Sequence, residues 1–292
     1  MSLQADADQF TLADGRTVGF NDFGPPDGET VLWCHGGPGS RLEPGGLAGA
    51  AAAAEAGLRL IGIDRPGYGH STPLPGRTIA QWVPDGLAVA DHLGIDRFVA
   101  VGVSTGGAYS LALASLAPER VRGVVACCAL TDMRWHEGKQ MVNVGQMHDI
   151  WSAPTRDAAI KVAVDSFGED GSKLAVQDEA TQLAPADLAL FTDPEWLAQM
   201  APAMQPMFAQ GVVGYADDRI ADGPGWGTFD VGRIRCPVEV IHGSDDSLVP
   251  VAHARHTAEI VPNARLTVVD GLGHLSIGPA VIPAVGRVLE RT

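Results

Sequence analysis

The sequence predicts an α/β protein in which a mostly parallel central sheet is flanked by helices and interrupted by one helical insertion. Three observations lead to this prediction. Apolar runs of strand length recur along the chain, segments with helical spacing alternate with them, and the rhythm stops between about residues 131 and 232. Strands that are apolar at every position are typical of parallel sheets covered on both faces.

The individual elements follow from this alternation. Residues 9–23 are expected to form a hairpin, with Asp14-Gly15 at its turn. Six later strands are expected at residues 31–34, 58–63, 98–103, 121–130, 238–242 and 266–269. Helices are expected at residues 47–56, 79–93, 104–116, 252–260 and 280–289. Helical connections of this kind join parallel strands, so most strand pairs should be parallel.

Residues 131–232 differ in composition from the rest of the chain, and a structureless loop of this length would be unusual. Six of the seven methionines and four of the six tryptophans lie there. Residues 156–167 have helical spacing, and Thr192-Asp193-Pro194-Glu195 resembles a helix start with a capping box. We interpret the insertion as a helical cap whose methionines form an adaptable apolar surface, or alternatively pack the cap onto the body. Residues 211–232, rich in Gly, Asp and Pro, are expected to form the return to the body.

The composition restricts the class of protein. Of the 292 residues, 46% are hydrophobic, as expected for a globular core, and the net charge of −15 disfavours nucleic acid and anionic membranes as partners. The sequence has no apolar run long enough for a membrane helix and no visible signal peptide. Its four cysteines lack metal-site spacing. We therefore expect buried thiols, a cytoplasmic location and a small-molecule substrate, with the oligomeric state left open.

A candidate nucleophile lies in the segment Gly102-Val103-Ser104-Thr105-Gly106. This G-x-S-x-G segment follows an expected strand and precedes an expected helix, which is the context in which the pattern exposes a serine on a tight turn. The glycines permit close approach of the backbone, and the helix start favours negative charge. The alternative role for Ser104 is that of a turn residue that caps the helix.

Two later loops contain a candidate acid and a candidate base. Asp245 and Asp246 follow the expected strand at 238–242, and His274 follows the last expected strand in Gly271-Leu272-Gly273-His274. A serine needs a base that a third group orients, and the chain order Ser, Asp, His is the one that accompanies this type of turn. Histidine suits the role of base because its pKa lies near neutrality. From the loops alone Asp245 and Asp246 remain alternatives, and Asp132, just beyond residues 121–130, is a third.

A glycine-rich loop supplies the remaining part of the expected site. His35-Gly36-Gly37-Pro38-Gly39-Ser40 follows the strand expected at residues 31–34. Backbone amides aimed at a developing negative charge form an oxyanion hole. We assign the donors to the amides of Gly37 and Thr105, and we expect the His35 ring to hold the loop.

Taken together, these residues resemble the α/β-hydrolase superfamily. The matching segments are His35–Gly39, the turn Asp64-Arg65-Pro66-Gly67-Tyr68-Gly69-His70-Ser71, the turn at Ser104, the Asp loop and the His loop, so that the resemblance covers nearly the whole chain outside the insertion. It implies a catalytic domain of residues 1–130 and 233–292, with residues 131–232 as a cap where many members carry one. In the family the acid stands three residues after the loop glycine and four before a proline, which selects Asp246. The resemblance makes Asp64 and Arg65 structural, and the position near Asp132 carries the acid in some members.

The residues at positions 35–39 and at the Ser104 turn indicate which branches of the superfamily the chain resembles. The His35–Gly39 segment is similar to proline iminopeptidases and to small bacterial esterases and lactonases. Haloalkane dehalogenases and epoxide hydrolases place aspartate where this chain has Ser104. Proline iminopeptidases typically have Gly-Gly-Ser-Trp-Gly at this turn, and the chain departs from that pattern. The resemblance therefore implies a serine hydrolase.

The functional hypothesis is hydrolysis of a small, largely apolar carboxylic ester or lactone through an acyl-enzyme, with no metal and no cofactor. One alternative is an aminopeptidase or amidase, whose substrate amine needs acidic groups such as Glu137, Asp149, Asp217 or Asp218. A second is a C–C bond hydrolase that uses the same triad. A third, from another class, is a ligand-binding protein with this fold and no turnover.

Overall fold

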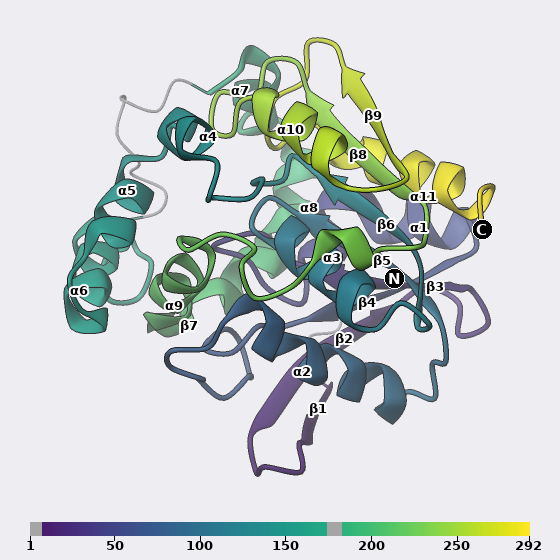
Figure 1. Ribbon diagram of the computed structural model, residues 1–292, viewed down its shortest axis with the longest axis horizontal. Helices are drawn as coiled ribbons and strands as arrows, with labels where there is room; N and C mark the ends of the chain where they lie inside the picture. Colours follow the sequence, from purple (N-terminus) through teal and green to yellow (C-terminus); the bar gives the residue numbers. More distant parts are fainter. Residues whose placement is uncertain (1–7, 174–182) are drawn as a thin grey trace.

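The centre of the protein is an eight-stranded sheet, seen in a computed structural model that describes residues 8–173 and 183–292 (Figure 1). The strands are β1 (Asp8–Thr11), β2 (Thr17–Phe23), β3 (Glu29–Cys34), β4 (Leu58–Ile63), β5 (Phe98–Val103), β6 (Val121–Cys127), β8 (Val238–Gly243) and β9 (Ala264–Val269). They lie in the order β1-β2-β4-β3-β5-β6-β8-β9. β2 pairs antiparallel with β1 and with β4, and the other pairs are parallel. The mostly parallel sheet is thus confirmed.

Helices cover both faces of this sheet. One face packs against α2 (Ile79–His92), α3 (Gly106–Leu116) and α10 (Ala252–Ile260), and the other against α1 (Ala50–Glu55) and α11 (Val281–Leu289). Successive residues of a strand face opposite ways, so Leu32 of β3 lies in the first core and Trp33 in the second. Because both faces are buried, the central strands read as continuous apolar runs.

Three expected boundaries differ from the observed ones for a local reason. The strand expected at residues 121–130 ends at Cys127, because Cys128 has a left-handed backbone with φ of 40°. The helix expected from Ser104 begins at Gly106, because Ser104 itself has φ of 52°. The helix expected at 47–56 starts as a π-helical stretch, Pro44–Gly49, and becomes α1 only after Gly49.

Residues 131–232 contain helices, as expected. They are α4 (His136–Met141), α5 (Gly145–Ser152), α6 (Arg156–Phe167), α7 (Pro185–Leu190), α8 (Pro194–Met204) and α9 (Val213–Asp222), with a short strand β7 (Ala209–Val212) before α9. In Figure 1, α5, α6 and α9 gather at the left, and they share a core that includes Met147, Ala163 and Tyr215. The Asp193 side chain caps α8 by accepting from the amides of Glu195 and Trp196.

Residues 211–232, expected to form the return to the body, contain the helix α9 in their first half. Its charged side chains are buried rather than exposed. Asp217 pairs with Arg156, Asp218 with Arg65, and Arg219 with Asp222. Asp217 and Asp218 have partners far along the chain, so their burial cannot be seen in the local composition.

Three of the four thiols are buried, as the composition suggested. The cysteines are free; Cys34, Cys127 and Cys128 are buried, and Cys236 is partly buried. Within the described ranges, 8–173 and 183–292, we find no helix with the length and apolar character needed to cross a membrane.

Candidate active site

Ser104 lies at the carboxyl end of β5, on a strained turn that leads into α3. Its φ of 52° is a left-handed value that costs energy for a residue with a Cβ. The turn is fixed by a hydrogen bond of 2.9 Å from the Ser104 amide to the Cys127 carbonyl. A Cβ at Gly102 would overlap the carbonyl oxygen of Gly106, and one at Gly106 would overlap that of Cys34. Glycine is therefore required at both positions, and the turn leaves the Ser104 side chain partly exposed.

Asp246 and His274 meet in space. His274 Nδ1 lies 2.8 Å from Asp246 Oδ2, and the same oxygen lies 3.1 Å from His242 Nε2. The other oxygen, Asp246 Oδ1, accepts hydrogen bonds of 3.0 and 2.9 Å from the amides of Leu248 and Val249. The acid is thus held on both oxygens, and it orients the imidazole through Nδ1, which leaves Nε2 as the atom that can take up a proton.

The two alternative acids do not contact His274. Asp245 is exposed and accepts a hydrogen bond of 2.7 Å from Ser244 Oγ. Asp132 lies 2.6 Å from Arg134 Nη2 and accepts from the Trp226 amide at 2.9 Å. Among the three aspartates that the sequence proposes, Asp246 is the one that the fold brings to the histidine.

The charges of this pair stabilise each other. Burial alone would lower the pKa of His274, but the Asp246 carboxylate beside the ring outweighs it and raises this pKa well above its usual value. Burial would likewise raise the pKa of Asp246, but the hydrogen bonds and charges of His274 and His242 hold it below its usual range. The carboxylate therefore stays ionised and favours a protonated imidazole.

The side chains of Ser104 and His274 are not hydrogen-bonded to each other in this structure. Within the described part of the chain, no hydrogen bond connects Ser104 Oγ with His274 Nε2. Catalytic hydrogen bonds are often long or poorly aligned before a substrate binds. The oriented acid–base pair and Ser104 lie in loops that follow the carboxyl ends of β8, β9 and β5.

The glycine-rich loop lies against the turn of Ser104. A Cβ at Gly36 would stand 3.8 Å from the Ser104 Cβ, and one at Gly37 would stand 2.9 Å from Thr105 Oγ1. Within residues 8–173 and 183–292, neither the Gly37 amide nor the Thr105 amide donates to a protein acceptor. Two unoccupied donors from adjacent segments can therefore serve an oxygen of a ligand.

Hydrogen bonds from buried side chains fix the conformation of the glycine-rich loop. His35 Nδ1 lies 2.6 Å from the Gly36 carbonyl, and His35 Nε2 accepts from the Arg65 amide at 3.1 Å. Burial keeps the pKa of His35 well below its usual value, so the ring is neutral. The Arg65 guanidinium donates to the carbonyls of His35 and Gly36. The Glu43 carboxylate accepts from the Gly36 amide at 2.9 Å.

Three residues that contact the site were not found from the sequence: Glu43, Asp187 and Arg219. Asp187 of α7 accepts hydrogen bonds from the amides of His274, Leu275 and Ser276. Arg219 of α9 donates to Thr105 Oγ1. Asp187 and Arg219 have no local signal in the sequence, because their partners lie far away along the chain, whereas Glu43 contacts Gly36 only seven residues away.

One group of side chains has the donors of a metal site. The ligand atoms of Cys128, Asp246 and His274 lie within 4.8 Å of one another. Asp246 and His274 already bond to each other, and burial raises the pKa of the Cys128 thiol well above its usual value. Since a metal would need a thiolate there, the group suits the acid–base pair better than an ion.

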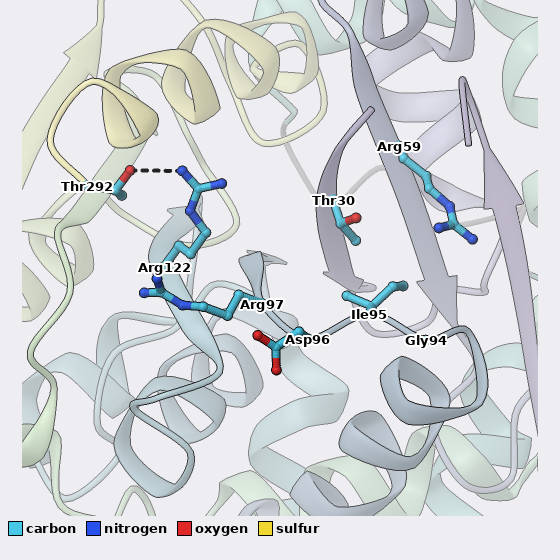
Figure 2. A pocket seen from close by; sticks show the side chains of 8 residues that line it. All are labelled: Thr30, Arg59, Gly94, Ile95, Asp96, Arg97, Arg122 and Thr292. Atoms are coloured by element: carbon cyan, nitrogen blue, oxygen red, sulfur yellow. Dashed lines mark hydrogen bonds between the residues drawn. The ribbon is translucent and has the colours of Figure 1, made fainter. Parts of the chain in front are cut away.

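A separate surface pocket lies at the amino ends of the strands, away from the loops described above (Figure 2). It is lined by Thr30, Arg59 and Arg122, which stand near the amino ends of β3, β4 and β6. Ser104 and the loops described above follow the carboxyl ends of their strands, the edge at which open α/β sheets bind ligands. The pocket of Figure 2 is therefore not part of the candidate site.

Comparisons with known proteins agree with this architecture. The sequence model of a family described as alpha/beta hydrolase fold matches residues 29–279. A 2-hydroxymuconate semialdehyde hydrolase from Pseudomonas putida is 30% identical over 266 residues, which cover 90% of this chain and 86% of that protein. A proline iminopeptidase from Xylella fastidiosa is 26% identical, covering 93% of this chain and 91% of that protein. The crystal structure of the enol-lactonase from Burkholderia xenovorans superposes with a TM-score of 0.71 at 21% identity, covering 97% of this chain and 100% of that one. The chain therefore belongs to the α/β-hydrolase fold family.

Proposed function

We propose that this protein is a serine hydrolase that cleaves a small, largely apolar carboxylic ester or lactone. Ser104 is the nucleophile, His274 the general base and Asp246 the acid that orients it. The observation that carries the proposal is the 2.8 Å contact between His274 Nδ1 and Asp246 Oδ2, in loops that follow the same edge of the sheet as the strained Ser104 turn. This constellation is defined by geometry and roles.

In the first half of the reaction, Ser104 Oγ attacks the ester carbonyl carbon as His274 Nε2 takes the hydroxyl proton. The tetrahedral intermediate collapses when the bond to the alcohol oxygen breaks, and His274 gives the proton to that oxygen. In the second half, His274 takes a proton from water, whose oxygen attacks the acyl-enzyme. The acid product then leaves, and the proton returns to Ser104 Oγ.

The negative oxygen of each tetrahedral intermediate lies at the amides of Gly37 and Thr105. Both amides lack a protein acceptor in the described ranges, which supports this role. Loss of one such donor typically costs about 3 kcal/mol of transition-state stabilisation. The Arg65 and Glu43 contacts keep the Gly37 loop in place before the substrate arrives.

Residues 131–232 act as a cap over this site. Two of their contacts support the assignment: Asp187 bonds to the loop of His274, and Arg219 bonds to Thr105. Apolar side chains in and next to α7 are exposed, among them Leu188 at 53% and Phe191, which follows α7, at 48%. An apolar cap favours an apolar acyl or alcohol group, and the net charge of −15 disfavours anionic substrates.

The aminopeptidase alternative needs an acidic group for the substrate amine, and two of the four that the sequence offers are engaged elsewhere. Asp217 and Asp218 are buried in ion pairs with arginines, and Glu137 and Asp149 are exposed on the surface. The second candidate is hydrolysis of a C–C bond in a diketone by the same residues. It is favoured by the 30% identity to a protein named for 2-hydroxymuconate semialdehyde rather than for an ester.

Steady-state kinetics on three substrate sets tests this proposal. The sets are p-nitrophenyl esters of increasing chain length with small lactones, prolyl amides, and vinylogous diketones. The proposal predicts turnover of short esters or lactones, a p-nitrophenol burst equal to the enzyme concentration when deacylation is slow, and loss of both in Ser104→Ala. Turnover of diketones alone would replace the ester assignment with the second candidate, and equal turnover by Ser104→Ala would reject the triad.

A further inference from the structure

The guanidinium of Arg219 lies close to both residues whose amides are the proposed oxyanion donors. Arg219 Nη2 donates a hydrogen bond to the Thr105 hydroxyl. A Cβ built on Gly37 would stand 2.9 Å from the same nitrogen. The side chain comes from α9, in the inserted segment, and only 1% of it is exposed. One buried cation therefore contacts the two residues whose amides face the oxyanion.

The surroundings of this cation supply one counter-charge at ion-pair distance and few other polar partners. Its one carboxylate neighbour within ion-pair distance in the described ranges is Asp222, whose Oδ2 lies 2.9 Å from Nη2. The other contacts are the Met147 sulfur, 3.5 Å from Nη1, and the Tyr215 ring, whose centroid is 5.3 Å from the guanidinium carbon. Arg219 Nε has no hydrogen-bond partner among the described residues. A charge in such surroundings acts strongly, because little water screens it.

The neighbouring buried charges also leave an excess of positive charge. Arg65 and Arg77 share a single carboxylate, that of Asp218, so three guanidiniums face two aspartates. Burial raises the pKa of Asp222 to about 6 despite Arg219 beside it. Two further charged groups are Lys139, which acts on Asp222, and Glu43, which accepts a hydrogen bond from the Gly36 amide. Buried charge is costly when unpaired, so the cluster favours one more negative charge close by.

We propose that Arg219 is a positioning residue that fixes Thr105 and makes the oxyanion hole electrostatically positive. This inference rests on the proposed function. Two amides alone already favour a negatively charged tetrahedral species over a neutral carbonyl. The positive charge of Arg219 increases this preference. The corresponding ligands are compounds that form an oxyanion on Ser104, such as trifluoromethyl ketones.

The test compares two inhibitors of the same shape. An alkyl trifluoromethyl ketone forms an anionic hemiketal with Ser104, whereas its methyl ketone analogue binds as a neutral carbonyl. In Arg219→Met the trifluoromethyl ketone should bind roughly 10- to 100-fold more weakly, somewhat less than the loss of a direct donor, with methyl ketone affinity nearly unchanged. Arg219→Lys, which keeps the charge, should restore most of the affinity. Asp222→Asn keeps an acceptor for Trp151 but removes the counter-charge, and it should strengthen trifluoromethyl ketone binding.

Arg156→Met is the matched control, because Arg156 also pairs with an aspartate of α9, Asp217, but does not contact Thr105. It should leave both inhibitor constants unchanged. Equal weakening of both inhibitors in Arg219→Met would mean a packing role and would overturn the inference, as would weaker trifluoromethyl ketone binding in Asp222→Asn. If Arg219→Met does not fold, the opposite expectations for Arg219→Lys and Asp222→Asn still decide the matter. A wild-type enzyme that neither forms the adduct nor hydrolyses esters would instead reject the proposed function, and this inference with it.

Discussion

Asp187 accepts a hydrogen bond of 2.8 Å from the backbone amide of His274, so a residue of the inserted segment holds the loop of the proposed base. The same carboxylate accepts from the Leu275 and Ser276 amides and from Ser276 Oγ, at 3.1, 2.8 and 2.7 Å. It is fully buried on α7. The position of α7 and the geometry of His274 are therefore coupled.

Replacing Asp187 by Asn should slow catalysis and destabilise the fold. The amide keeps one acceptor oxygen and turns a donor toward a backbone N–H, which costs about 1–3 kcal/mol. A displaced His274 should lower kcat by roughly 10- to 100-fold, with KM little changed. Urea unfolding and ester kinetics measure the two effects. Asp193→Asn is the control, since asparagine caps α8 equally well. Equal behaviour of the two variants would rule out the coupling.

Asp246 and Asp245 should respond differently to the same substitution. Asp246→Asn removes the charge that stabilises the protonated imidazole, and kcat should fall by about 10⁴-fold. Asp245→Asn alters an exposed side chain, and kcat should stay within about twofold of wild type. Ester kinetics on the purified variants measures both. A larger loss of kcat in Asp245→Asn than in Asp246→Asn would contradict the assignment of Asp246 as the acid.

Activity should depend on pH through His274. The reaction needs the neutral imidazole, and the Asp246 carboxylate raises the pKa of His274 above its usual value of 6.5 in spite of burial. The value of kcat/KM should therefore rise with pH and reach half of its maximum above pH 6.5. Initial rates with a p-nitrophenyl ester from about pH 5 to about pH 9 give the profile. A midpoint below 6.5 would contradict the assigned charge state.

Glu43 should make the protein less stable as the pH rises. Burial raises the pKa of Glu43 from 4.5 to about 7, although Trp33 and Gly36 donate hydrogen bonds to it. A raised carboxyl pKa contributes stability that is fully present below pH 4.5 and is lost as the pH rises through 7. Relative to wild type, Glu43→Gln should therefore gain up to about 3 kcal/mol between these limits.

Urea unfolding of both proteins at about pH 5 and about pH 8 measures this gain. Glu259→Gln changes an exposed glutamate and serves as the control. A stability difference between Glu43→Gln and wild type that does not change with pH would show that the Glu43 carboxyl is not held in its raised-pKa state.

The sequence predicts those parts of the site whose residues are marked by neighbouring residues in the chain. The Ser104 turn is marked by glycines that close contacts require, and the loops of Asp246 and His274 follow apolar strands. The pairing of His274 with Asp246 rather than Asp245 could be inferred only from spacing typical of the family. The strand at 121–130 was overextended because Cys128 is apolar in type but left-handed in backbone.

The remaining contacts have no local signature. Asp187 and His274 are 87 positions apart, and Arg219 and Thr105 are 114 positions apart. From the sequence alone, an aspartate or arginine in a helical segment is expected to be exposed to solvent, because its buried partner is known only from the fold. For the same reason the composition of residues 211–232 does not reveal α9, in which Asp217, Asp218, Arg219 and Asp222 are buried.

The most direct test of the central claim is labelling with a fluorophosphonate probe, followed by mass spectrometry of the digested protein. The account predicts one modified peptide, with the phosphonyl group on Ser104, and labelling that is absent in Ser104→Ala and slow in Asp246→Asn. A properly folded wild-type protein that takes up no probe, or takes it up at another residue, would contradict the assignment of Ser104 as the nucleophile.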